Sequence, residues 1–301
     1  MELGIIGMGK MGLPLALNGR DKGLAIVVHT EKSEKLALLE REGVRGFARL
    51  EEFVAALHRP RAVWLMVPAG QAVDDTIARL LPLLEGGDCI IDGGNSHYRD
   101  SRRRHRELRD RDIRFLDVGT SGGTGGARHG ACLMIGGDAE VYAGLEPVFN
   151  ALSGGMGCAL LGPAGSGHYV KMIHNGIEYG MMQAIGEGLD ILRHSPLPLE
   201  PDRVTAVWRR GSIVSGLLMD MTAAALAREP GLESIQGVVA VSGEANWTVE
   251  EAVRIGVSAP VIATALFSRF KSQDRERYAE KTVAAMRREF GGHSVVADAG
   301  E

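Results

Sequence analysis

The sequence predicts an α/β protein in which a doubly wound sheet is followed by an all-α domain. Two observations lead to this prediction. Up to about residue 163, short apolar stretches typical of buried strands alternate with helical patterns, and several strands run into glycine-rich loops. Beyond that point the periodicity is that of helices only. We therefore expect two domains, residues 1–163 and residues 164–301.

The first strand leads into a glycine motif. The apolar run Leu3–Ile6 is followed by GMGKMG at residues 7–12, a predicted helix at Leu13–Asp21 and a second strand at Leu24–His29. In such a unit the first glycine permits a tight turn, the second lets a pyrophosphate touch the backbone, and the third lets the helix pack closely. We predict a Rossmann-type dinucleotide-binding domain. The alternative is a glycine-rich turn in another α/β protein.

The end of the second strand indicates which dinucleotide binds. An acidic residue about 20 positions beyond the glycines accepts hydrogen bonds from a ribose 2′-hydroxyl and repels the 2′-phosphate of NADP. Between His29 and Ser33, Glu31 is the only acid, and no arginine is present. We therefore expect NAD to be preferred. Lys32 leaves NADP open, and Glu31 pointing into water is the simpler alternative.

The next strands end in loops of the same kind. A strand at Ala62–Val67 precedes Pro68-Ala69-Gly70 and a helix at 72–84, and a strand at Cys89–Asp92 precedes Gly93-Gly94-Asn95. Open α/β sheets bind ligands at the carboxyl ends of their strands. The predicted cofactor-binding residues are therefore Gly7, Met8, Gly9, Lys10, Met11, Gly12, Thr30, Glu31, Lys32, Val67, Pro68, Ala69 and Asn95.

An arginine-rich stretch follows at residues 99–114. Acidic side chains are interleaved with its arginines. We therefore predict a solvated charged helix, and consider a nucleic-acid-binding patch the weaker alternative.

A glycine-rich stretch lies beyond the next predicted strand, Phe115–Val118. Residues 120–126 contain four glycines and three hydroxyl side chains. This composition predicts a loop of exposed backbone amides that suits a carboxylate or phosphate, with a flexible turn as the alternative. A strand at Cys132–Ile135 and a helix at Val141–Leu152 continue the alternation.

A long predicted helix, Gly165–Leu192, carries the most reactive side chains. Lys171, His174, Asn175 and Glu178 lie at offsets of zero, three, four and seven, so they share one side of the helix. Such a set can move protons and hold an oxygen-rich substrate, whereas a solvated face is the alternative. The apolar residues expected to pack against a core are Met172, Ile173, Ile177, Met181, Met182 and Ile185.

Helical patterns continue to the end of the chain. We predict helices at 202–210, 213–228, 248–256, 259–270 and 275–290. Thr248 followed by Glu251 has the spacing of an N-cap with a capping box.

Composition excludes several classes of protein. The 301 residues carry a formal net charge of −4, which gives no reason to expect nucleic acid as a partner. The three cysteines are far apart, so we expect no metal and reduced thiols. No signal peptide and no apolar run of about 18 residues is seen, so we expect a cytoplasmic protein without membrane contact.

In their order along nearly the whole chain, several segments match a known family. They are GMGKMG at 7, VPAG at 67, IIDGGNSHYRDSRRR at 90, SGGTGGARHGACLMIGG at 121, GHYVKMIHNGIEYG at 167 and FGGH at 290. The chain resembles the decarboxylating 6-phosphogluconate dehydrogenases in their shorter bacterial form, within the β-hydroxyacid dehydrogenase superfamily. IIDGGNS and KMIHNGIEYG are the specific segments.

The resemblance implies oxidation of 6-phospho-D-gluconate to D-ribulose 5-phosphate and CO2 by NAD or NADP, without a metal. Lys171 would be the general base that takes the proton of the 3-hydroxyl, which requires a lowered pKa. Glu178 would protonate carbon 1 of the enediol. The implied substrate-binding residues are Asn95, Ser121, Gly122, Gly123, His174, Asn175, Tyr179, Arg269, Arg287 and His293.

The resemblance also implies a homodimer or higher homo-oligomer, because Arg287 and His293 match residues that a partner subunit contributes. The chain departs from the family pattern at Asn246, where a basic residue is common, and at Pro68, where relatives have lysine. Asn246 favours the alternative of a β-hydroxyacid dehydrogenase for another sugar acid or small 3-hydroxy acid. A cofactor-binding sensor without catalysis is a third reading, which intact Lys171 and Glu178 disfavour.

Overall fold

The structure, a computed structural model, describes residues 1–155, 157–241 and 243–297. The chain divides into two compact units, Met1–Asn175 and Gly176–Glu301. The division falls inside one long helix, α8 (Ser166–Arg193).

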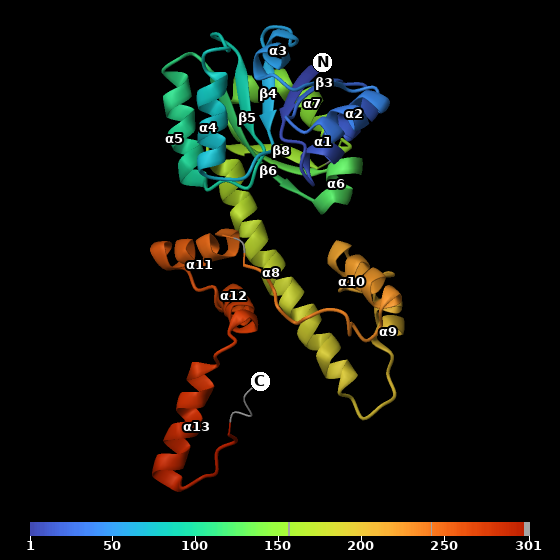
Figure 1. Ribbon diagram of the computed structural model, residues 1–301, viewed down its shortest axis with the longest axis vertical. Helices are drawn as coiled ribbons and strands as arrows, with labels where there is room; N and C mark the ends of the chain where they lie inside the picture. Colours follow the sequence, from blue (N-terminus) through green and yellow to red (C-terminus); the bar gives the residue numbers. More distant parts are fainter. Residues whose placement is uncertain (156, 242, 298–301) are drawn as a thin grey trace. The chain divides into compact units, whose positions relative to one another are not determined.

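The first unit is built on an eight-stranded sheet (Figure 1). The strand order is β3-β2-β1-β4-β5-β6-β7-β8, and all neighbouring pairs are parallel except β6 and β7. Because the order reverses on either side of β1, this is the predicted doubly wound sheet. The strands are β1 Glu2–Ile6, β2 Ala25–His29, β3 Arg45–Phe47, β4 Ala62–Leu65, β5 Cys89–Asp92, β6 Arg114–Ser121, β7 Cys132–Gly137 and β8 Cys158–Gly162.

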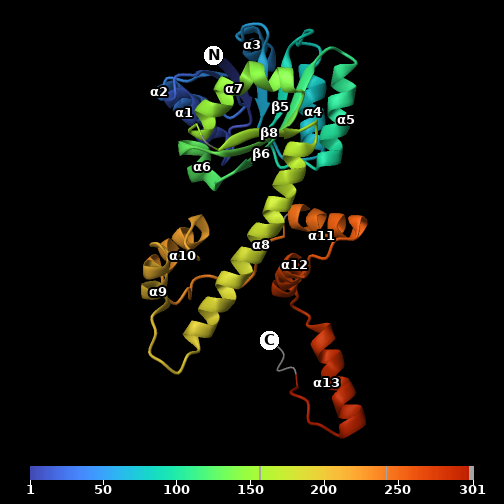
Figure 2. The ribbon, with the colours of Figure 1, turned by 180° about the vertical axis from the view of Figure 1, so that it is seen from behind.

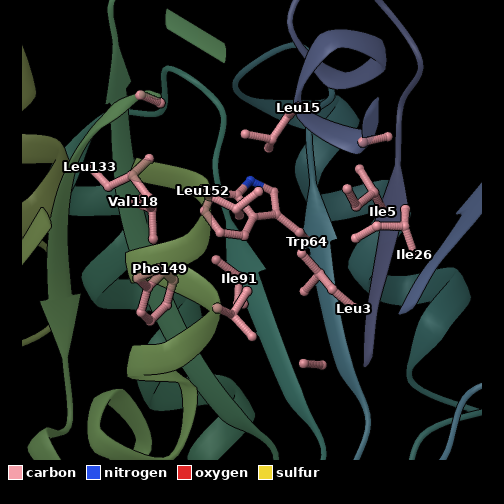
Figure 3. Packing of buried hydrophobic residues seen from close by; sticks show 14 of the residues in the cluster. Leu3, Ile5, Leu15, Ile26, Trp64, Ile91, Val118, Leu133, Phe149 and Leu152 are labelled. Atoms are coloured by element: carbon pink, nitrogen blue, oxygen red, sulfur yellow. The ribbon is translucent and has the colours of Figure 1, made fainter. Parts of the chain in front are cut away.

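Helices cover both faces of this sheet (Figures 1 and 2). Successive strand residues point to opposite faces, so Ile5 of β1 belongs to one apolar cluster and Ile6 to another. Trp64 and Phe149 lie in the first cluster, with Leu3 and Ile5 from the sheet (Figure 3). The helices are α1 Gly12–Asp21, α2 Ser33–Arg41, α3 Leu50–Ala55, α4 Gln71–Leu80, α5 Tyr98–Arg109, α6 Gly123–His129 and α7 Ala139–Ser153.

Three features of this unit differ from the sequence-based expectation. No element was predicted for α2, β3, α3 and β8, which are short. The glycine-rich stretch is not a loop throughout, because residues 123–129 form α6. The arginine-rich helix ends at Arg109, and its Arg104 is buried rather than solvated.

The second unit is all-helical, as predicted. After the end of α8 it contains α9 Pro201–Trp208, α10 Leu217–Arg228, α11 Gly243–Ile255, α12 Pro260–Gln273 and α13 Tyr278–Gly291. Its small core joins Tyr179 to Ala245, Ala265 and Leu266. A Cβ at Gly176 would approach Thr248 to 2.7 Å, so the glycine lets α8 and α11 pack closely.

Two predictions for the helical part are wrong. Thr248 does not cap α11 but lies within it, where its Oγ1 donates to the carbonyl oxygen of Glu244 at 2.9 Å. Of the apolar side chains on α8, Met172 is buried, whereas Ile177 and Met181 are 51% and 52% exposed and Met182 is 42% exposed. Periodicity identifies residues that share a helix face, but not what covers that face.

Candidate active site

The glycine turn between β1 and α1 has the form that a dinucleotide needs. A Cβ at Gly7 would overlap the Met66 carbonyl oxygen, and one at Gly12 would overlap the Gly7 carbonyl oxygen. Gly9, in contrast, has open space beyond it, with no atom within 4 Å of an added Cβ. No side chain caps the N-terminus of α1. Backbone amides there face room for an anion, so the turn fits a pyrophosphate.

At the end of β2 the structure adds a residue that sequence reasoning missed. Arg79 of α4 places its Nη2 3.3 Å from Oε1 of Glu31, and both side chains are exposed. Thr30 is buried and its Oγ1 accepts from the Lys32 amide at 3.4 Å. The expectation that no arginine accompanies Glu31 therefore holds for the neighbouring sequence but not in space.

The loops after β4 and β5 lie against each other at the same edge of the sheet. A Cβ at Gly94 would lie 3.0 Å from the Val67 carbonyl oxygen, and a Cβ at Gly7 would lie 3.3 Å from Val67 Cγ1. The structure thus brings together three predicted cofactor segments: the glycine turn, Val67–Ala69 and the Asn95 loop.

Lys171 is the centre of a polar cluster in the first unit. It is 8% exposed, and its Nζ donates to Oδ1 of Asn175 at 2.7 Å and lies 3.5 Å from Nδ1 of His174. Nε2 of His174 is 3.0 Å from Oγ of Ser121. The predicted residues Ser121, Lys171, His174 and Asn175 are therefore assembled, and the cluster can exchange protons with a bound hydroxyl.

Backbone packing determines where Lys171 lies. A Cβ at Gly119 on β6 would overlap the Cβ of Lys171, so only glycine leaves room for it there. The buried carboxylate of Asp117 accepts from the amides of Gly165 at 2.6 Å and His168 at 2.9 Å, which caps the start of α8. Asp117 was not predicted, although an acid inside an apolar strand is a signal for such a cap.

In the second unit, α8 brings Tyr179 to Arg269. The Arg269 guanidinium carbon lies 3.3 Å from the centroid of the buried Tyr179 ring, and Nη1 donates to the Ala240 carbonyl oxygen at 3.1 Å. A cation over an aromatic face is a stable arrangement that fixes the guanidinium. Glu178 precedes Tyr179 and is half-buried. Asn246, where a basic residue was expected from the resemblance, donates from Nδ2 to Oε1 of Glu250 on the same helix at 2.6 Å.

Arg287 and His293 lie on α13 and just after it. No residue of α13 is buried. His293 contacts Phe290, with ring centroids 6.3 Å apart, and neither predicted residue forms an ion pair within the described part of this unit. The unit therefore does not assemble these two residues with Tyr179 and Arg269.

Among the described residues, no group of three or more His, Cys, Asp or Glu side chains is placed to hold a metal ion. None of the described helices is both long and apolar enough to cross a membrane.

Both parts of the chain match models of a known protein family. A family model described as the NAD binding domain of 6-phosphogluconate dehydrogenase matches residues 2–162. A second, described as the C-terminal domain of 6-phosphogluconate dehydrogenase, matches residues 167–298. Together they span nearly the whole chain.

Individual relatives agree with these family models. A Bacillus subtilis (strain 168) protein, named provisionally as a 6-phosphogluconate dehydrogenase, is 44% identical over 294 residues, which are 98% of this chain and 99% of that one. The NAD(+)-dependent, decarboxylating 6-phosphogluconate dehydrogenase of Haloferax volcanii is 38% identical over 297 residues, 98% of each chain. Among solved structures, Plasmodium falciparum 6-phosphogluconate dehydrogenase, determined alone, with NADP+ and with 6-phosphogluconate, superposes with a TM-score of 0.83 at 33% identity, covering 100% of this chain and 67% of that one.

Proposed function

This chain belongs to the 6-phosphogluconate dehydrogenase family, and we propose that it oxidatively decarboxylates 6-phospho-D-gluconate to D-ribulose 5-phosphate and CO2. The observation that carries this proposal is the buried cluster of Lys171, Asn175, His174 and Ser121. It offers a proton acceptor surrounded by hydrogen-bonding groups, next to the loops that fit a dinucleotide. The nicotinamide supplies a hydride acceptor when it is bound.

In this proposal Lys171 first acts as a base. Its neutral amine takes the proton of the substrate 3-hydroxyl while the hydride on carbon 3 leaves for the nicotinamide. Protonated Lys171 then donates to the 3-keto oxygen, which accepts the electron pair as the bond to the carboxylate breaks and CO2 departs. No metal is needed, because the polarised β-keto acid has an electron sink of its own.

Glu178 completes the sequence as an acid. It delivers a proton to carbon 1 of the enediol, and Lys171 takes back the hydroxyl proton as the ketone of ribulose 5-phosphate forms. The two residues are seven positions apart on α8, about 10 Å along the helix axis at 1.5 Å per residue. Side chains of this length can reach neighbouring carbons of one sugar acid. Tyr179 and Arg269 would hold its phosphate, since the guanidinium is already fixed over the ring.

The proposal includes NAD as the preferred cofactor. Glu31 at the end of β2 would accept from the ribose 2′-hydroxyl and repel a 2′-phosphate. Its neighbour Arg79 partly neutralises that repulsion, so NADP remains the second cofactor. The relatives include proteins of both kinds, one NAD(+)-dependent and one solved with NADP+.

We also propose that the protein works as a homodimer or higher homo-oligomer. Arg287 and His293 would complete the substrate site of a second copy, because their own unit leaves them exposed and unassembled with Arg269. The exposed Ile177 and Met181 of α8 are apolar side chains that a second copy could cover.

One observation favours a second candidate function. Asn246 lacks the positive charge common at this position in the family and bonds to Glu250 instead. A substrate with less negative charge, such as an unphosphorylated sugar acid or a small 3-hydroxy acid, would suit that site better.

A substrate panel distinguishes the two candidates. Reduced nicotinamide is followed with 6-phosphogluconate, gluconate and small 3-hydroxy acids, each with NAD and with NADP. The proposal predicts the highest kcat/KM with 6-phosphogluconate and NAD. A higher value with an unphosphorylated acid would replace the proposed substrate and leave the dehydrogenase class in place.

A further inference from the structure

Arg104 on α5 is a buried arginine outside the proposed catalytic residues. Its side chain is 1% exposed, although it belongs to a helix with five other arginines. The buried residues of α5 are Tyr98, Ser101, Arg104 and Leu108, at spacings of three and four, so Arg104 lies on the helix face that packs inward. A guanidinium is not buried in this way without partners, because losing its hydration is costly.

The partners of Arg104 come from two separate segments of the chain. Its Nε donates to Oδ1 of Asp74 at 2.7 Å and its Nη2 to the Gly70 carbonyl oxygen at 3.0 Å; both acceptors belong to the start of α4. Its Nη1 donates to Oδ2 of Asp92 at 3.1 Å and to Oγ of Ser96 at 3.3 Å, at the end of β5. All three guanidinium nitrogens are thus engaged, and helices α4 and α5 lie side by side in both views (Figures 1 and 2).

Asp92 transmits this contact to the loop that follows β5. Its side chain is 0% exposed, and it accepts from the Gly94 amide at 3.2 Å and from Oγ of Ser96 at 2.7 Å. Asn95 lies between these two residues. A buried carboxylate such as that of Asp92 requires a counter-charge. Arg104 provides it through an ion pair, with Nη1 3.1 Å from Oδ2 of Asp92.

We propose that Arg104 is a positioning residue that holds the Val67–Gly70 loop and the Asn95 loop in one arrangement before the cofactor binds. The guanidinium does not touch cofactor or substrate; it acts through Gly70 on one side and Asp92 on the other. This inference rests on the proposed function for the identity of the ligands, but its first readout, cofactor binding, requires no turnover. Loops that are already ordered do not have to be ordered when the cofactor binds, so less of the binding free energy is lost.

The charge state of Asp74 agrees with the geometry. Burial by itself would raise the pKa of Asp74, but hydrogen bonds from Arg104 and Arg103 outweigh it and hold that pKa below its ordinary value of 3.8. The Asp74 carboxylate therefore acts as an anionic acceptor near neutral pH.

Arg103 is a matched control on the neighbouring position. It makes a bidentate contact with Asp74 at 2.9 and 3.0 Å and an ion pair with Glu107, but it bonds to neither Asp92, Ser96 nor Gly70. Its side chain is 38% exposed. Arg103→Lys therefore makes the same chemical change beside the same aspartate without touching the Asn95 loop.

The test compares Arg104→Lys with Arg103→Lys in the full-length protein. Lysine keeps the charge but has a single nitrogen, which cannot bridge both loops at once. We expect Arg104→Lys to raise the NADH dissociation constant about tenfold and to lower kcat at saturating cofactor, because Asn95 is displaced in the complex as well. We expect Arg103→Lys to change both values less than twofold. NADH binding is measured by fluorescence titration, and thermal unfolding is recorded for each variant.

Two further variants separate positioning from folding. In Arg104→Ala, added guanidinium ions should restore cofactor affinity, which a loss of fold would not allow. If Arg104→Ala does not fold, Ser96→Ala removes a single acceptor and should raise the NADH dissociation constant about threefold. A folded Arg104→Lys with wild-type NADH affinity and wild-type kcat would overturn the inference. Wild-type protein that binds NADH but does not turn over 6-phosphogluconate would instead contradict the proposed function alone.

Discussion

The Lys171 region and the C-terminal region of the chain are held in different ways. Around Lys171, three contacts come from the first unit: Asp117 caps α8, Gly119 leaves room for the lysine, and Ser121 contacts His174. On α13, which carries Arg287, no residue is buried. One part of the proposed site is thus held in place by packing within the first unit, whereas the part on α13 is exposed in its own unit. Substitutions in the two regions should therefore fail in different ways.

The largest effect is expected at the centre of the preorganised region. Lys171→Met removes the proposed base and should lower kcat by about 10³-fold, within the range that general acid–base groups contribute. NADH binding should stay within twofold of wild type, because Lys171 is not among the predicted cofactor contacts. A loss of turnover together with normal NADH binding, measured by fluorescence titration, would support the proposed role. The surface variant Lys22→Met serves as the control. Unchanged kcat would remove Lys171 from the mechanism.

Gly119→Ala tests the packing that holds the lysine. The new Cβ would overlap Lys171, so the side chain must shift, and a shift of about 1 Å at a reacting group can cost about 10²-fold in rate. Gly144→Ala on α7 is the control, since a Cβ there meets no atom within 4 Å. Steady-state kinetics of the two variants measure the difference. Equal activity would mean that the lysine is not confined by β6.

His293→Ala probes the exposed region. Losing a hydrogen bond to a charged substrate should lower kcat/KM by about 10- to 100-fold. The melting temperature should not move, because the described residues around His293 form no core. A marked drop in melting temperature would show instead that His293 stabilises its own unit.

Mixing two impaired variants sharpens the same comparison. If His293 completes the site of a second copy, unfolding and refolding Lys171→Met together with His293→Ala creates hybrid dimers with one intact site. For random pairing, about a quarter of the wild-type sites would be active. No recovery above the sum of the separate variants would contradict the shared site.

The smallest effect is expected at Glu31, which is exposed like His293 but lies in the first unit. Glu31→Gln removes the repulsion of a 2′-phosphate and leaves Arg79 without its ion-pair partner. The ratio of kcat/KM for NAD to that for NADP should fall about tenfold, while kcat with NAD changes little. Glu34→Gln is the matched control. An unaltered ratio would place cofactor selection in other residues.

The sequence predicted most of the alternation of strands and helices in the first unit because most strands are short apolar runs, and several of them lead into glycine-rich loops. It missed α2, β3, α3 and β8, which are stabilised by packing in or on the sheet more than by their own pattern. It also misjudged residues 123–129, since glycines disfavour a helix locally, yet they form α6.

Site residues were predictable where a local motif carries them. The glycine turn and the Lys171 helix are of this kind, whereas Ser121 was implied only by the family resemblance, and its contact with His174 comes from the structure. Arg79 and Arg104 were not predictable, because their partners are far away along the chain: Glu31 in one case, Asp74 and Asp92 in the other. An ion pair between residues far apart in the sequence produces no periodic pattern by which one arginine of a charged helix could be distinguished from the others.

The central claim is that this chain couples oxidation to decarboxylation. The most direct measurement uses 6-phosphogluconate labelled at carbon 1, with NADH and labelled CO2 quantified in the same reaction. The account predicts that the two appear in a one-to-one ratio with NAD as oxidant. NADH formed while the label stays in an organic acid would contradict it and identify a dehydrogenase that does not decarboxylate.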